Sequence, residues 1–150
     1  MLKLFRNTAL ILIITTSGLY AQENTARLID WKFLAKVTFK DKYYPDLEAW
    51  YVKPVFPESI QKLDGKRVII KGYIIPLDVE GGVYALSAYP FSACFFCGGA
   101  GPESVMSLKF KETPRRFKTD DVVTLSGFLK LNDSNVDEFS YILQKAEEID

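Results

Sequence analysis

The chain has 150 residues, of which 48% are hydrophobic and 14% aromatic, and its 19 basic and 19 acidic residues balance to a net charge of zero. This length suits one hydrophobic core, and the charge balance gives no general attraction to nucleic acid or anionic lipid. Histidine is absent, which excludes catalytic triads and zinc hydrolase sites that depend on an imidazole. We therefore expect one domain that is not an enzyme and does not bind nucleic acid.

The first 21 residues have the order of a secretory signal peptide. Lys3 and Arg6 precede an apolar run at residues 9–14, and small or polar residues then lead to Ala21. The apolar run is shorter than the roughly 20 residues that span a bilayer, so we expect cleavage near Ala21 and no retained membrane anchor. The mature periplasmic chain, residues 22–150, would have 17 basic and 19 acidic residues and a net charge of −2.

The next segment predicts a hairpin. Apolar residues alternate with polar ones over residues 31–39, a pattern typical of a strand with one buried face. Residues 41–46 indicate a turn and residues 48–55 a second extended segment, which together give an N-terminal hairpin at about residues 30–56. Pro57 favours the start of a short helix over residues 58–63.

Five further segments predict a barrel over about residues 64–146. The first and fourth are long, and each contains an interior glycine, Gly72 and Gly127, of the kind that marks a bulge or a sharp bend. An irregular connection joins the third to the fourth, and an acidic tail follows the fifth. This outline is that of an all-β protein with a five-stranded OB-like barrel. The predicted strands cover residues 66–76, 83–89, 105–110, 122–131 and 139–143.

The sequence also resembles a known family. The residues that carry the likeness are Leu-Asp-Gly-Lys-Arg-Val at 63–68, Lys-Gly-Tyr-Ile-Ile-Pro-Leu at 71–77, Asp-Trp at 30–31, and Gly-Pro at 101–102. They are similar to an uncharacterised family of small exported bacterial proteins with an OB-like barrel and a cysteine-containing loop. The resemblance covers residues 30–145 and implies an exported single domain, with some relatives suspected of working beside transporters of transition metals. Many relatives would carry a histidine where this chain has Phe96, so only Cys94 maps onto the family pattern, with Cys97 as a substitute ligand.

Both cysteines lie in one loop, Cys94-Phe95-Phe96-Cys97, and three interpretations of the pair compete. An exported pair at this spacing favours a disulfide. The same two sulfurs suit a soft metal, Cu(I) or Zn(II), but a closed zinc site needs further ligands, such as Glu103 or the same loop of a second subunit in a homodimer. A thiol-disulfide oxidoreductase is the third interpretation, although the glycines that follow do not readily begin the helix that would lower a thiol pKa.

The glycine-rich end of the loop has two interpretations. Gly98, Gly99 and Gly101, followed by Pro102, could form a backbone nest for an anion or a tight turn that sets the register of the next strand. We expect an exported binding module that uses residues 94–102, with zinc or copper as the leading ligand. The alternative is a protein-interaction or structural module, whose partner would be an envelope protein or a transporter.

Overall fold

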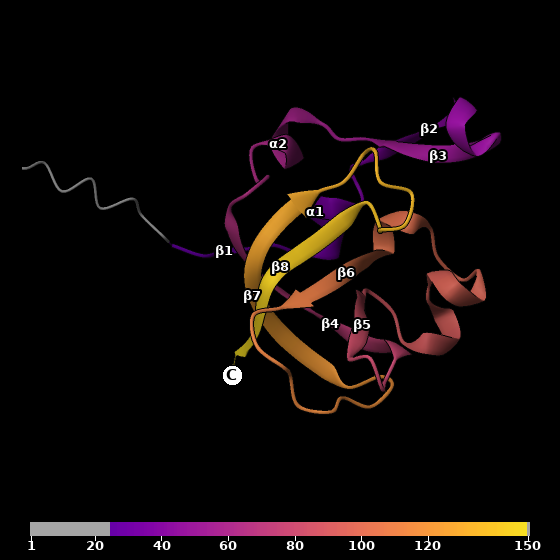
Figure 1. The fold of residues 1–150 in the computed structure, drawn as a ribbon. Helices are drawn as coiled ribbons and strands as arrows, with labels where there is room; N and C mark the ends of the chain where they lie inside the picture. The colour runs from indigo at the N-terminus through magenta and orange to yellow at the C-terminus, as the bar shows by residue number, and fades with distance from the viewer. Residues whose placement is uncertain (1–24, 150) are drawn as a thin grey trace, which may run out of the picture.

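The computed structural model describes residues 25–149, and strands dominate it (Figure 1). The predicted all-β class is confirmed. None of the helices among these residues is long and apolar enough to cross a bilayer. The predicted signal peptide lies outside the described residues. The elements are β1 (Arg27–Leu28), α1 (Trp31–Leu34), β2 (Thr38–Tyr44), η1 (Pro45–Leu47), β3 (Ala49–Val55), α2 (Glu58–Gln61), β4 (Arg67–Asp78), β5 (Val83–Ser87), η2 (Phe91–Ala93), η3 (Phe95–Cys97), η4 (Pro102–Ser104), β6 (Val105–Phe110), β7 (Val122–Leu131) and β8 (Tyr141–Ile149), where η marks a 3-10 helix.

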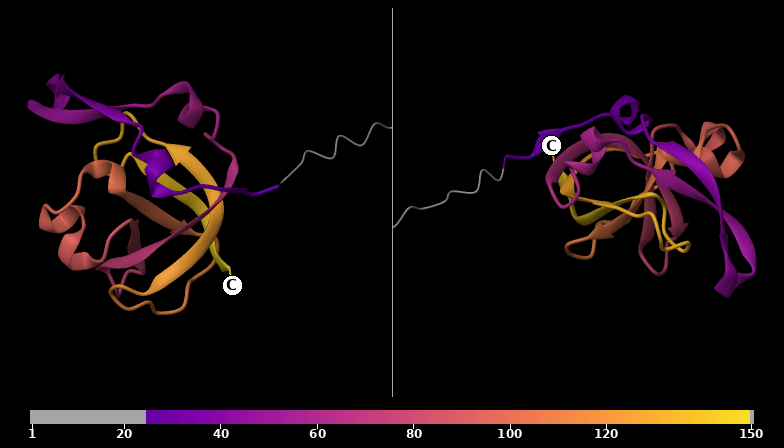
Figure 2. Two further views of the ribbon diagram at one scale, coloured as in Figure 1. Left: turned by 180° about the vertical axis from the view of Figure 1, so that it is seen from behind. Right: turned by 90° about the horizontal axis from the view of Figure 1, so that it is seen from above.

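Five strands close into a barrel in the order β4, β5, β6, β8, β7, with β7 returning to pair with β4 (Figures 1 and 2). Neighbouring strands run antiparallel except β6 and β8, which are parallel. This order is that of an OB-fold, so the predicted five-stranded barrel is confirmed. The short strand β1 pairs with β4 in parallel orientation, with Arg27 opposite Val68 and Leu28 opposite Ile69.

Interior glycines allow the two long strands to bend. β4 pairs with β7 over Arg67–Tyr73 and then with β5 from Tyr73 onward, so it serves two sides of the barrel. A Cβ on Gly72 would lie 2.7 Å from the carbonyl oxygen of Ser87, and one on Gly127 would lie 2.8 Å from that of Gln144. Real Cβ atoms are not found this close to backbone oxygens. Both sites therefore require glycine.

The barrel interior is filled mainly by aliphatic side chains, together with Tyr84, Phe117 and Tyr141. Tyr141 is fully buried, and its hydroxyl donates a hydrogen bond of 2.7 Å to the carbonyl oxygen of Leu34 at the end of α1. Burial raises the pKa of Tyr141 well above its ordinary value, and the charge of Glu103 adds to the effect. This hydrogen bond fixes α1 across the barrel end. The other fully buried side chains of this core are Leu34, Ile60, Val68, Ile70, Ile74, Leu86, Met106, Leu125, Leu129 and Leu143.

The strand predicted over residues 31–39 is wrong in its first half, because residues 31–34 form helix α1. The side chain of Asp30 accepts a hydrogen bond of 2.7 Å from the backbone N–H of Phe33 and so caps the helix. The indole N–H of Trp31 donates to the carbonyl oxygen of Lys71 at 2.8 Å, and Leu34 is fully buried. The cap and these two anchors favour a helical turn over an extended chain.

The N-terminal hairpin is present, but it is shorter than the predicted range of residues 30–56, because its first strand begins at Thr38. Residues 41–44 belong to β2 and not to a turn; the turn is η1, where Pro45 begins a 3-10 helix and Glu48 ends it with a φ of 49°. β2 and β3 pair over their full length and form a separate two-stranded sheet that projects beyond the barrel (Figures 1 and 2). At its base, Lys53 forms an ion pair of 3.0 Å with Asp133 in the β7–β8 loop.

The predicted acidic tail is also wrong, because β8 continues to Ile149. Basic side chains pair with its two glutamates. Glu147 contacts Arg67 at 3.1 Å and Lys111 at 2.7 Å, and Glu148 contacts Arg115 at 2.9 Å. These pairs allow an acidic segment to occupy a barrel strand.

Candidate functional site

The cysteine loop, residues 88–104, connects β5 to β6 and consists largely of three short 3-10 helices. Prolines mark its stages: Pro90 precedes η2 and Pro102 begins η4. Gly98 ends η3 with a φ of 72°, a conformation that favours glycine, and a Cβ on Gly99 would lie 2.6 Å from the carbonyl oxygen of Ala93. These two glycines therefore serve the tight folding of the loop.

Cys94 belongs to a second, smaller core. Its side chain is fully buried and packs with Ile75, Ala85 and Val105, and Phe95 lies at the edge of the cluster. The thiol of Cys94 donates a hydrogen bond of 3.1 Å to the carbonyl oxygen of Phe91. Buried free cysteines commonly behave as small apolar side chains, and Cys94 has that environment.

This second core lies on the outer side of the barrel. Tyr84 and Leu86 of β5 belong to the main core, whereas Ala85, between them, belongs to the second core. Successive side chains of a strand point to opposite faces, so the cysteine loop covers the outer face of β5 and β6. In other OB-folds the face made by the second and third barrel strands binds ligands. Here the chain itself covers part of that face.

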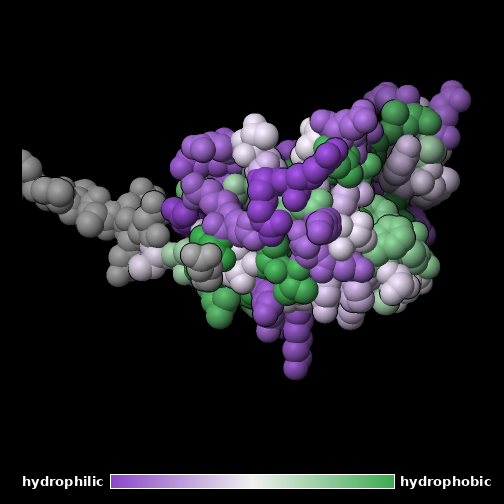
Figure 3. Space-filling view, turned by 90° about the horizontal axis from the view of Figure 1, so that it is seen from below, coloured by the Kyte–Doolittle hydropathy of each residue, from purple (hydrophilic) through white to green (hydrophobic). Residues whose placement is uncertain are grey.

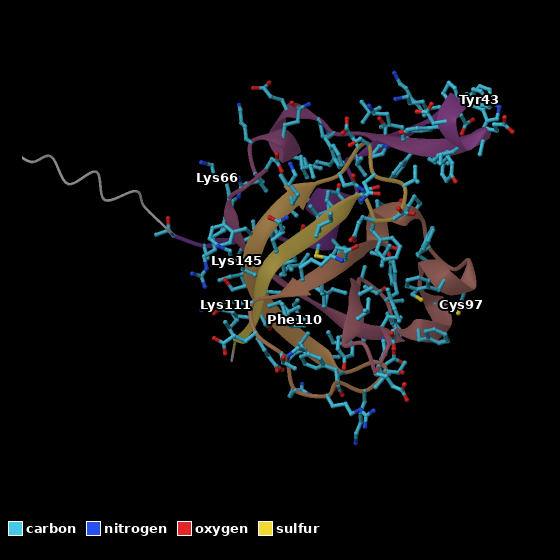
Figure 4. The ribbon with its side chains drawn as sticks, viewed as in Figure 1. Tyr43, Lys66, Cys97, Phe110, Lys111 and Lys145 are labelled. Carbon is cyan, nitrogen blue, oxygen red and sulfur yellow. The ribbon has the colours of Figure 1, made fainter. Side chains whose placement is uncertain are left out.

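Cys97 has a different environment. It is exposed, and Figure 4 shows it at the outer edge of the loop, away from the barrel. Both cysteines are free thiols, so the predicted disulfide is not formed in this structure. Tyr89, Phe91 and Phe96 are also exposed on the loop. The loop therefore presents one thiol and three aromatic rings to solvent.

Phe96 is partly held by neighbouring rings. Its ring meets those of Phe95 and Phe139 edge to face, with centroids 5.8 Å and 5.7 Å away. Phe139 lies in the loop between β7 and β8, so this cluster of rings connects the cysteine loop to the β7–β8 loop. Such ring pairs hold Phe96 in place at the surface.

Glu103, the predicted third metal ligand, lies on η4, which contacts α1. Within residues 25–149, no three histidine, cysteine, aspartate or glutamate side chains are grouped so that they could hold a metal ion. Cys94, Cys97 and Glu103 therefore do not form a three-ligand cluster. The two thiols remain the groups of this loop that a soft metal could use, and metal binding stays a prediction.

Two residues of the basic linker between β6 and β7, Lys111 and Arg115, form ion pairs with acidic groups of the same chain. Arg115 contacts Asp121 at 3.0 Å and Glu148 at 2.9 Å, and its guanidinium lies 4.2 Å from the ring centroid of Phe117. The lower side of the molecule carries mostly hydrophilic side chains, with apolar patches scattered between them (Figure 3). Arg115 is thus engaged within the chain.

A second surface feature escaped the sequence analysis. Trp50 is 70% exposed, and Tyr43 and Val52 are exposed beside it on the N-terminal hairpin. The doublets Tyr43-Tyr44 and Trp50-Tyr51 contained a signal for this surface. Two consecutive aromatic residues in a strand point to opposite faces, so a two-stranded sheet that contains such doublets places aromatic rings on both sides.

Comparison with known proteins supports the fold. No family model matches the chain, and no curated protein matches it. Among solved structures, a DUF3299 family protein from Pseudomonas aeruginosa PAO1 is similar. The similarity has a TM-score of 0.53 and 19% sequence identity, and it covers 84% of this chain and 97% of that chain. At this identity the likeness shows a shared barrel fold.

Proposed function

We propose that this chain is an exported binding module without catalytic activity, and that the outer surface of its cysteine loop binds another protein. The observation that carries the proposal is the unequal placement of the two cysteines. Cys94 is buried in the second core beneath the loop, whereas Cys97 lies at the surface on the same loop as three exposed aromatic rings. Aromatic side chains are enriched in the buried centres of protein interfaces.

A soft metal is the rival ligand. Two thiolates that bind Cu(I) must both face the ion, but the thiol of Cys94 is buried and donates to the carbonyl oxygen of Phe91. Metal binding at both sulfurs would require the loop to leave the second core. The placement of Cys94 therefore favours a protein partner over a metal.

Metal titration separates the two ligands. We expect the reduced mature protein to take up no stoichiometric Cu(I) or Zn(II) in competition with a chromophoric chelator. One equivalent of either metal, lost in both Cys97→Ser and Cys94→Ser variants, would establish the metal site instead.

Cross-linking from Cys97 tests the protein partner. A maleimide that carries a benzophenone is attached to Cys97, because the buried Cys94 is protected, and the labelled protein is irradiated in an envelope extract. We expect a cross-linked protein that is lost when Phe96 is replaced by serine. As a control, the same label is placed on Ser59→Cys in a Cys97→Ser background, at an exposed position of α2. Equal cross-linking from both positions would contradict the proposal.

A further inference from the structure

The hairpin arm, β2 and β3 with their joining turn (residues 38–55), is a second candidate surface, and it does not depend on the cysteine loop. The arm forms its own two-stranded sheet. Figure 4 shows Tyr43 near its free end, beyond the barrel. Residues opposite each other in an antiparallel pair have side chains on the same face, so the register assigns each side chain of the arm to one of two faces.

One face of the arm is aromatic and exposed. Tyr43 lies opposite Trp50, and Asp41 lies opposite Val52. The rings of Tyr43 and Trp50 are in contact, with centroids 5.4 Å apart, yet Trp50 is 70% exposed and Val52 is 57% exposed. We call this the aromatic face. Leu47, in the turn at the tip, is also exposed.

The opposite face, which we call the basic face, carries three lysines beside a second aromatic pair, Tyr44 and Tyr51, whose ring centroids lie 5.7 Å apart. Lys42 lies opposite Tyr51, and Lys40 lies opposite Lys53. The ammonium group of Lys42 lies 4.6 Å from the ring centroid of Tyr44, and Lys53 forms its ion pair with Asp133. This basic face includes the contact by which the arm meets the β7–β8 loop.

The three acidic residues of the arm lie on the aromatic face or at the tip of the arm. Asp41 lies on the aromatic face, and Asp46 and Glu48 lie in the turn at the tip. None of the three forms an ion pair with any residue in the described part of the chain, and all three are exposed. The aromatic face therefore combines apolar rings with unpaired negative charge.

We propose that the aromatic face docks on a different protein, whose surface offers an apolar recess bordered by lysine or arginine. Trp and Tyr are the side chains that most often dominate interface energies when they enter a pocket. Complementary charges at the rim of such a recess would speed association and fix the orientation of the arm. Asp41, Asp46 and Glu48 supply the negative side of this complementarity.

A second copy of the chain fits this surface less well. Two aromatic faces packed against each other would bring the acidic groups of both arms together, which costs free energy. An aromatic face packed on the basic face of a second copy would leave that copy's own aromatic face free. Such head-to-tail contacts require the copies to close into a ring or to extend into a filament. An anionic membrane would repel the same three carboxylates.

Photo-cross-linking from neighbouring positions tests the docking. A photoreactive phenylalanine is placed at Val52 or at Tyr51 in the full chain, in cells that naturally produce it. The two positions are adjacent in β3 but point to opposite faces. We expect a cross-link to another protein from position 52 and not from position 51. A cross-link to a second copy, an equal cross-link from both positions, or no cross-link from position 52 would overturn the proposal.

Affinity measurements with the purified cross-linked protein complete the test. Trp50→Ala should weaken binding at least about tenfold. Tyr51→Ala is the matched control and should leave affinity nearly unchanged. Asp41→Lys should weaken binding and reduce its dependence on salt. Sedimentation of the chain with vesicles of phosphatidylethanolamine and phosphatidylglycerol, lost in Trp50→Ala, would show that the arm binds lipid and would overturn the proposal.

Thermal melts of Trp50→Ala and Tyr51→Ala show whether both variants fold. The failure of this proposal leaves the proposal for the cysteine loop intact, because Cys97 and Phe96 lie on a different segment and are probed by a different label. Conversely, stoichiometric Cu(I) uptake by the thiols would leave the prediction for the arm unchanged.

Discussion

At the scale of single residues, Cys94 and Cys97 lie only three positions apart in the sequence but have different environments. The spacing of Cys94 and Cys97 predicted that both sulfurs act together, but one is buried in the second core and the other is exposed. The residues between them, Phe95 and Phe96, are identical in type. The sequence therefore contained no sign of which end of the motif would face the barrel, and packing against Ala85 and Val105 decides it.

Replacing each cysteine by alanine should separate these roles. Cys94→Ala removes a buried sulfur from a packed cluster and should lower the free energy of unfolding by about 1–2 kcal/mol. Cys97→Ala should change it by less than about 0.5 kcal/mol, because the side chain is exposed. Urea unfolding followed by tryptophan fluorescence measures both. Equal losses in the two variants would contradict the assignment of Cys94 to the core.

At the scale of elements, the strands with strong apolar patterns were predictable and the charged or capped segments were not. β6 and β7 were predicted at their observed bounds, because they are rich in apolar residues and end at polar turns. β8 was predicted too short, because Glu147 and Glu148 indicated a solvated tail. In the structure, Lys111 and Arg115 form ion pairs with these two glutamates. Ion partners distant in sequence leave no local signal.

The contact between α1 and β8 depends on one hydroxyl group. Tyr141→Phe removes the donor and leaves the carbonyl oxygen of Leu34 with the backbone N–H of Val37, at 3.2 Å, as its remaining partner. We expect the free energy of unfolding to fall by about 1–2 kcal/mol. Tyr73→Phe is the control, since the Tyr73 hydroxyl makes no hydrogen bond to the described residues, and its effect should stay within about 0.5 kcal/mol. Chemical denaturation of both variants measures the difference.

The ion pairs of β8 predict a dependence of stability on pH. The hydrogen bond from Lys111, together with its charge, lowers the pKa of Glu147 below its ordinary value of 4.5. The backbone N–H of Lys118 and the side chain of Arg115 lower the pKa of Asp121 below 3.8. A carboxyl group whose pKa is lower in the folded state than in the unfolded state stabilises the folded state at pH values above its unfolded pKa. This stabilisation is lost as the pH falls through the folded pKa.

We therefore expect the melting temperature to fall as the pH is lowered from about 5 to below 4. The fall should be smaller in Glu147→Gln, which has no carboxyl group to protonate at this position. Glu80→Gln, in the β4–β5 turn where no ion pair is formed with the described residues, should leave the pH profile unchanged. Parallel profiles for the wild type and Glu147→Gln would show that this pair contributes nothing to the acid response.

At the scale of the whole molecule, the barrel could be predicted from five strands and two interior glycines, but the surfaces could not. Gly72 and Gly127 indicated bends, and the structure shows backbone oxygens close to both. The cover of the cysteine loop over β5 and β6 depends on contacts between segments far apart in sequence. The two faces of the hairpin arm depend on the register of β2 against β3. This register could not be predicted, because residues 41–44 were predicted to form a turn.

Barrel closure predicts that Gly72→Ala is strongly destabilising. The added methyl group would meet the carbonyl oxygen of Ser87 and the side chain of Leu86, so β4 or β5 would have to shift. We expect a loss of about 2 kcal/mol or more. In the control, Gly101→Ala, the added methyl group meets the carboxyl end of Glu103, which can rotate away. Thermal melts compare the two variants, and a loss in Gly101→Ala as large as that in Gly72→Ala would contradict this prediction.

The position of β8 between β6 and β7 governs when the chain can fold. β8 follows both neighbours in sequence but lies between them in the barrel. A chain that has emerged from a ribosome as far as residue 131 has one unpaired edge on β6 and another on β7, and water reaches the interior. The barrel can close only when residues 141–149 are available to form β8. Synthesis of these nine residues therefore sets the earliest point at which the barrel can fold.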